Sequence, residues 1–117
     1  MDEYFYYVRD KENRPIVTVC LIKDKQGNVG KGFSICSLSE VSPEKSEGRK
    51  RAKGRARRAF KKWKKSKCSV TSPVKRKEAF EALMNATRPL LPMKSFAAKC
   101  VYNPDLNKME QLLLKAR

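Results

Sequence analysis

The side chains with the clearest chemistry in this sequence are cations, and one segment holds nearly half of them. Residues 45–67 contain 13 Lys and Arg and one acid, Glu47, so this segment carries +12 of the chain's net charge of +16. Like charges crowded on one element repel one another, and a polyanion relieves the repulsion because each neutralised phosphate releases counterions. The pattern predicts phosphate binding and therefore a nucleic-acid partner, either RNA or DNA.

The expected nucleic-acid contacts are ten bases of this segment. They are Arg49, Lys50, Arg51, Lys53, Arg55, Arg57, Arg58, Lys61, Lys62 and Lys64. Arg49, Lys50 and Lys53 are expected to grip the phosphate backbone first, and the other bases continue the contact along the segment. Phosphate contacts position a protein without reading bases, so low sequence specificity on an RNA or DNA duplex is expected.

Other chemistries are poorly supplied. The chain has no His, which removes the usual proton-transfer side chain near neutral pH and the commonest nitrogen ligand of metals. The cysteines Cys20, Cys36, Cys68 and Cys100 form no C-x-x-C pair, so a zinc site would need ligands from four separate elements. Neither pair of carboxylates near the N-terminus has a third acid beside it. The sequence predicts no catalytic residue, no metal site and no cofactor, and hence no enzyme.

The apolar residues argue against a membrane partner. No apolar run approaches the roughly 20 residues that a membrane-spanning helix needs. The start Met1-Asp2-Glu3 is acidic, whereas a signal peptide begins with basic residues followed by an apolar stretch. The basic segment also lacks the wide apolar face of a membrane-surface helix. A soluble protein of the cytoplasm is therefore expected.

The first third of the chain predicts a β-meander over residues 4–37. Aromatic and β-branched residues predict strands at Tyr4–Val8, Pro15–Lys23 and Asn28–Ser37. Gly27 lies in the second link and supplies the positive φ that a short hairpin loop commonly requires. Side chains alternate between the faces of a strand. In the third strand Gly30, Gly32 and Ser34 therefore share one face, opposite Val29, Phe33 and Ile35. The glycine face admits a close neighbour.

A long basic helix is expected over residues 44–67. Small and aromatic residues recur in it at spacings of three and four: Gly48, Ala52, Ala56, Ala59, Phe60 and Trp63. This stripe is expected to lie on the sheet, and its two aromatic rings to pack there instead of stacking on bases. Gly54 is unfavourable in a helix interior. Either the helix crosses a strand backbone at Gly54, or a phosphate backbone approaches closely there.

Residues 73–117 are expected to form the C-terminal helices with a short strand between them. Ser72 would cap a helix whose first residue is Pro73, where the missing N–H costs nothing. A fourth strand is expected over Ser95–Tyr102, and Asn103-Pro104 would open a final helix. The chain is therefore predicted to be a single α+β domain over residues 1–117. Its three- to four-stranded antiparallel sheet would be packed by helices, the first of them long and strongly basic.

The order of three strands and a basic helix resembles part of a double-stranded RNA-binding domain. The segment Gly48-Arg49-Lys50-Arg51-Ala52-Lys53 opens the helix, and four of its residues match that family's Lys-Lys-x-Ala-Lys signature: Arg49, Lys50, Ala52 and Lys53. The resemblance implies a β-β-β-α core in which these cations grip phosphates across a groove. The loop Asp10–Pro15 departs from the family, because it lacks the Gly-Pro-x-His pattern.

A second resemblance covers roughly residues 17–60. The stretch Gly32-Phe33-Ser34-Ile35-Cys36-Ser37, followed by Gly48-Arg49 and Ala52-x-Gly54-Arg55-Ala56, resembles small bacteriophage and prophage accessory proteins of unassigned function. This resemblance implies a phage origin and leaves an alternative open. The protein would then inhibit a host defence complex, in the manner of an anti-CRISPR protein, by binding its protein or its guide RNA. A ribosome-associated protein is a second alternative.

The N-terminal run of aromatics indicates an edge strand. Four consecutive rings, Tyr4 to Tyr7, must divide between the two faces of a strand. Either Tyr4 with Tyr6 or Phe5 with Tyr7 is expected to be accessible. An edge strand can pair with a second copy of the chain, so a homodimer through this strand is also left open.

Overall fold

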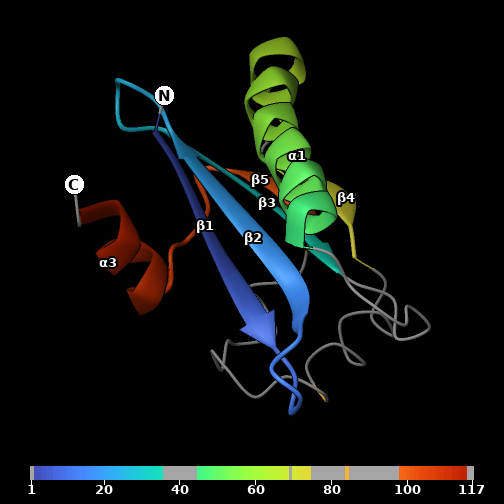
Figure 1. Cartoon of the computed structure of the whole chain (residues 1–117). Helices are drawn as coiled ribbons and strands as arrows, with labels where there is room; N and C mark the ends of the chain where they lie inside the picture. Colours follow the sequence, from blue (N-terminus) through green and yellow to red (C-terminus); the bar gives the residue numbers. More distant parts are fainter. Residues whose placement is uncertain (1, 36–44, 69, 75–83, 85–97, 116–117) are drawn as a thin grey trace.

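The computed structural model describes residues 2–35, 45–68, 70–74, 84 and 98–115 (Figure 1). Its elements along the chain are β1 (Asp2–Arg9), β2 (Pro15–Lys23), β3 (Val29–Ile35), α1 (Lys45–Ser66), β4 (Val70–Pro73), β5 (Ala98–Tyr102) and α3 (Lys108–Lys115). The five strands form one antiparallel sheet in the order β1-β2-β3-β5-β4. Figure 1 shows α1 and α3 on different sides of this sheet. The α+β class predicted from the sequence is confirmed.

The meander of β1, β2 and β3 lies close to the predicted positions. The bounds of β2 are as predicted, and β1 is longer than predicted at both ends. Strand β3 begins one residue later than predicted, while residues 36 and 37 lie outside the described part of the chain. Gly27 has a φ of 88°, which confirms its role in the hairpin loop. Strand β1 is the edge of the sheet, and pairing of a second copy with it stays a prediction.

One face of the sheet holds the larger core. Tyr6, Val19 and Phe33 are opposite one another on β1, β2 and β3 and belong to one buried cluster, which Leu114 of α3 joins. Tyr4 and Tyr6 are both buried with 8% exposure. Phe5 lies on the other face, in the cluster beneath α1. Alternation along β1 therefore directs Tyr4 and Tyr6 into the core and leaves Phe5 and Tyr7 half-buried.

The other face carries α1 in very close contact, as its glycines predict. A Cβ added to Gly32 would overlap the backbone of Ala52 and Ala56, and one added to Gly30 would overlap Phe60 and the carbonyl oxygen of Ala56. Ala52 and Ala56 have 0% exposure. Because β3 has glycines at the crossing and α1 has alanines, the two backbones come into direct contact. The predicted stripe of small residues is confirmed as the contact with the sheet.

One expectation about this crossing is wrong. An added Cβ at Gly54 would meet nothing within 4 Å, so α1 does not cross a strand backbone there. The crossing involves Gly30 and Gly32 on β3, and Gly48 lies against Thr18 of β2. Gly54 falls on the exposed side of the helix because it is two residues from both Ala52 and Ala56, and 100° per residue turns it away from the sheet.

The segment after α1 also differs from the prediction. Ser72 and Pro73 do not start a helix, because residues Val70–Pro73 form β4 and pair with β5. Pro73 ends this strand at the outer edge of the sheet, where a missing N–H is tolerated. The remainder of the predicted helix lies outside the described residues, apart from Val74 and Met84. Strand β5 confirms the predicted fourth strand, and β4 brings the sheet to five strands.

The last helix starts later than predicted. Asn103 has a φ of 47°, and its backbone N–H donates to the carbonyl oxygen of Val29, so it attaches the end of β5 to the start of β3 instead of capping a helix. Asn107 is the cap: its side-chain oxygen accepts from the N–H of Glu110 at 2.9 Å, and the Glu110 carboxylate accepts from the N–H of Asn107 at 3.1 Å. This reciprocal pair is a capping box.

A buried ion pair attaches α3 to the sheet. The Nζ of Lys31 lies 2.9 Å from a carboxylate oxygen of Glu110, and the Tyr6 hydroxyl donates to the same oxygen at 2.9 Å. Lys31 has 3% exposure and Glu110 has 0%. Burial, together with the Glu110 charge, raises the pKa of Tyr6, so the hydroxyl keeps the proton that it donates. Strands β1 and β3 thus hold α3 through one carboxylate.

We predict that Gly32→Ala destabilises the protein strongly. The added methyl would overlap the backbone of α1, which cannot move aside as a flexible side chain can. Overpacking costs about 1–3 kcal/mol, and more where backbone must shift. Urea denaturation measures this loss as a lower midpoint. Gly54→Ala is the matched control, with open space for its methyl, and an unchanged midpoint for Gly32→Ala would contradict the close crossing.

Candidate nucleic-acid interface

The cations of α1 divide according to how the helix is seated. The inner side is fixed by four small residues, which we call the inner strip: Gly48, Ala52, Ala56 and Ala59. Successive residues are turned by 100° around the helix axis. The surface of α1 away from the inner strip is therefore occupied almost entirely by Lys and Arg. The seating of the inner strip therefore determines where each predicted phosphate contact lies.

The side of α1 that faces β1 has partners for three predicted contacts. The Nζ of Lys53 lies 3.2 Å from the Glu3 carboxylate, and Nη2 of Arg57 lies 3.5 Å from the same oxygen. Arg49 donates to the Tyr7 hydroxyl at 3.3 Å. We call Arg49, Lys53 and Arg57 the flanking cations. Glu3 is 29% exposed, and ion pairs at this exposure contribute only about 0–1 kcal/mol.

Two further predicted contacts have different surroundings. Arg55 points to the sheet, and its Nη1 donates to the carbonyl oxygen of Phe33 at 2.7 Å. Arg51 is exposed, and its Nε lies 4.0 Å from the Glu47 carboxylate, a loose contact in solvent. Arg55 thus helps to hold α1 on β3, whereas Arg51 remains available to a ligand.

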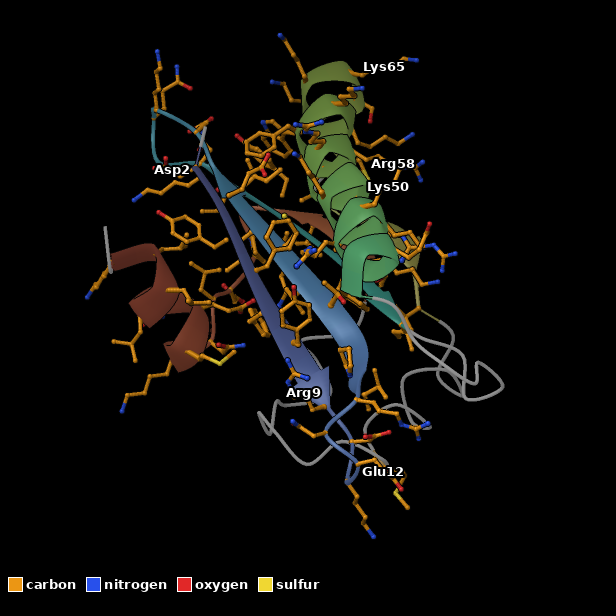
Figure 2. All side chains as sticks on the ribbon, viewed as in Figure 1. Asp2, Arg9, Glu12, Lys50, Arg58 and Lys65 are labelled. Atoms are coloured by element: carbon orange, nitrogen blue, oxygen red, sulfur yellow. The ribbon has the colours of Figure 1, made fainter. Side chains whose placement is uncertain are left out.

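Six further bases of α1 extend into solvent and have no acidic partner among the residues that the structure describes. All six are exposed, and we call them the outer cations: Lys50, Arg58, Lys61, Lys62, Lys64 and Lys65. Figure 2 shows Lys50, Arg58 and Lys65 at successive levels of α1. Five of the six are among the phosphate contacts predicted from the sequence, and Lys65 is not.

The bases also follow a seven-residue spacing that sequence reasoning missed. Adjacent pairs of bases recur at Lys50-Arg51, Arg57-Arg58 and Lys64-Lys65. Seven residues are close to two helical turns, so the three pairs lie above one another on the same side of α1. Gly54 and Lys61 lie midway between successive pairs. The result is two adjacent rows of cations with a central line between them.

The aromatic residues at the end of α1 are engaged with the sheet. Trp63 stacks on Tyr102 of β5 with ring centroids 4.8 Å apart and planes at 13°, and Phe60 meets the edge of the same ring at 5.5 Å. Phe60 also packs against the cluster formed by Cys20 and its neighbours. The prediction that both rings pack on the sheet is confirmed. Lys67 lies over Trp63, 5.4 Å from its ring centroid.

No other reactive cluster is seen in the described parts of the chain. They contain no group of three or more Cys, Asp or Glu side chains that could hold a metal ion. Burial raises the pKa of the Cys20 thiol to about 12, so this thiol stays protonated and unreactive. Asp10 accepts from the backbone N–H groups of Glu12 and Arg14 and so closes a turn. Within the same residues, no helix is long and apolar enough to cross a membrane.

Comparisons with protein-family models, curated proteins and solved structures find no match for this chain. The residues of α1 and their surroundings therefore carry the functional inference.

Proposed function

We propose that the protein binds nucleic-acid duplexes, RNA or DNA, through their phosphates, with the outer side of α1 as the contact surface. The supporting observation is the set of six outer cations, which have no ion pair among the described residues and stand on one helix that the inner strip fixes to the sheet. A group of positive charges held in place attracts a polyanion strongly, and binding releases the counterions of the polyanion.

The surroundings of each cation set the expected order of contact. The outer cations meet phosphates first because no carboxylate of the described residues has to be displaced from them. The flanking cations join when Glu3 releases Lys53 and Arg57. The sequence alone predicted that Arg49, Lys50 and Lys53, at the start of the helix, contact phosphates first. In the order proposed here Lys50 and Arg58 contribute more to binding than Arg49 and Lys53.

The two rows of cations favour a duplex over a single strand. Lys50 and Lys65 are 15 residues apart, which is about 22 Å along a helix. Two rows on adjacent sides of one rod can reach phosphates on both walls of a groove. Proteins that bind single strands instead offer aromatic rings for base stacking. Here Trp63 is stacked on Tyr102. Phosphate contacts of this kind give low sequence specificity.

Charge reversal on the outer side tests the proposal. Lys50→Glu combined with Arg58→Glu is expected to weaken binding to a 20-base-pair duplex at least tenfold at moderate salt. The slope of log K against log salt should fall by about two, because about 0.9 is lost per phosphate contact. Fluorescence anisotropy at two salt concentrations measures both quantities, for a DNA and an RNA duplex.

The matched control moves the same change of charge away from α1. Lys25→Glu combined with Lys108→Glu alters two exposed residues and is expected to keep most of the affinity. Equal losses in both double variants would contradict a contact surface on α1. A cellular partner that remains after nuclease treatment would favour the alternative of protein recognition in a host defence complex. Co-sedimentation with ribosomes would favour the ribosomal alternative.

Removal of the Glu3 charge is expected to strengthen binding. Glu3→Gln leaves Lys53 and Arg57 without their carboxylate, so a phosphate no longer competes with it. Because an exposed ion pair contributes at most about 1 kcal/mol, the expected gain in affinity is about 2- to 5-fold. The same anisotropy titration measures the gain, with Glu12→Gln in the β1–β2 loop as control. Weaker binding by Glu3→Gln would show that Glu3 positions the flanking cations instead of competing for them.

A further inference from the structure

Gly54 has no structural reason to be glycine. Glycine in the middle of a helix is less stable than alanine. Gly30, Gly32 and Gly48 are explained by close contacts, because a Cβ at each would overlap a neighbour. Gly54 is exposed, and a Cβ there would meet nothing within 4 Å. Its missing side chain therefore leaves open space on the outer side of α1 that no part of the described chain uses.

Four cations surround this space. On a helix, the neighbours of a residue are those three and four positions away, at about 5–6 Å between Cβ atoms. For Gly54 these are Lys50, Arg51, Arg57 and Arg58, so every neighbouring position is basic. We call this arrangement the Gly54 ring. The guanidinium groups of Arg51, Arg57 and Arg58 can each offer paired N–H donors to an oxyanion.

The existing contacts of the ring leave it open to an anion. Lys50 and Arg58 form no ion pair within the described residues. Arg51 and Arg57 meet Glu47 and Glu3 at 4.0 Å and 3.5 Å, both longer than the 2.7–2.9 Å of a strong charged hydrogen bond. An incoming phosphate therefore displaces little. Four cations without a close anion between them repel one another, and a phosphate at the centre relieves that repulsion.

Lys61 is the equivalent of Gly54 seven residues later, but it has a side chain at the centre of its four neighbours. Its neighbours three and four positions away are Arg57, Arg58, Lys64 and Lys65, so it stands in an equivalent ring seven residues further along. Its own side chain occupies the centre. The two rings share Arg57 and Arg58. Lys61 thus adds a cation to the central line, whereas Gly54 leaves room at the helix backbone.

We propose that the Gly54 ring is a subsite for one backbone phosphate of the bound nucleic acid, with Gly54 as its floor. This inference rests on the proposed function and locates its closest contact. A side chain at position 54 would stand at the centre of the ring and hold the phosphate away from the four cations. Glycine is retained there in spite of its cost to the helix because the ligand approaches the helix backbone.

The test is a pair of substitutions that change neither charge nor any contact of the free protein. Gly54→Ala is expected to raise the urea midpoint, because alanine favours the helix and has space. The same variant is expected to bind a 20-base-pair duplex about 3- to 5-fold more weakly, with a salt slope smaller by about one. Gly54→Leu fills the ring further and is expected to bind at least about tenfold more weakly. Opposite changes in stability and affinity cannot come from partial unfolding.

The control and the possible outcomes separate this inference from the proposed function. Ser66→Leu places the same side chain at an exposed residue of α1 outside the ring, removing only a local hydrogen bond to the Lys62 carbonyl, and is expected to bind like the unmodified protein. Wild-type affinity of both Gly54 variants would overturn the subsite, and the function would stand if Lys50→Glu with Arg58→Glu still loses binding. Wild-type affinity of all of these variants would overturn both. A lower urea midpoint for Gly54→Ala would also overturn the subsite, because Gly54 would then serve the fold.

Discussion

The direct contact between the backbones of α1 and β3 determines how α1 is oriented on the sheet. The backbones of Ala52 and Ala56 lie so close to Gly30 and Gly32 that only the inner strip of α1 can lie on β3 at this crossing. A rotation of the helix by one residue would place a Lys or Arg against the glycines. The crossing therefore fixes the rotation of α1 about its axis, and with it the set of cations that point to solvent.

The two faces of the sheet differ in whether their charged side chains are paired. Beneath α3, Lys31 and Glu110 neutralise each other in a buried pair that Tyr6 completes. Such a pair contributes little net stability but is costly to break, so it fixes which surface of α3 meets the sheet. On the α1 face, Glu3 and Glu47 reach only three of the described bases of the helix. Among the described residues, the charges of one face are paired within the protein, whereas most of the cations on the other face have no acidic partner.

The local signals predicted much of this fold. The alternation in residues 4–37 and the small-residue stripe of the basic segment each depend on neighbouring positions, and both were predicted close to their observed bounds. Strand β4 was missed because Ser72-Pro73 resembles a helix start, whereas its pairing with Ala98–Tyr102 depends on residues far away in the chain. The start of α3 was misplaced because Asn103-Pro104 competed with a second signal, the pair Asn107 and Glu110 of the capping box.

The candidate site was predicted in part for the same reason. The helix and nine of its ten expected contacts lie on exposed or flanking sides of α1, and Arg55 alone turns to a backbone carbonyl of the sheet. The seven-residue spacing of the base pairs was visible in the sequence and was missed. The partnership of Glu3 with Lys53 and Arg57 was not visible, because it joins positions 50 or more residues apart through the folded sheet. The role assigned to Gly54 depended on the rotation of α1, which only the crossing with β3 determines.

The crowding of the outer cations has a consequence for the protein without its ligand. Their mutual repulsion is screened by dissolved ions, with a Debye length of about 8 Å at physiological ionic strength. Added electrolyte should therefore stabilise the unliganded fold while it weakens the attraction to phosphates. If the protein binds phosphates as proposed, ionic strength acts on folding and on binding in opposite directions, and dilute buffers that strengthen binding are those in which the free protein is least stable.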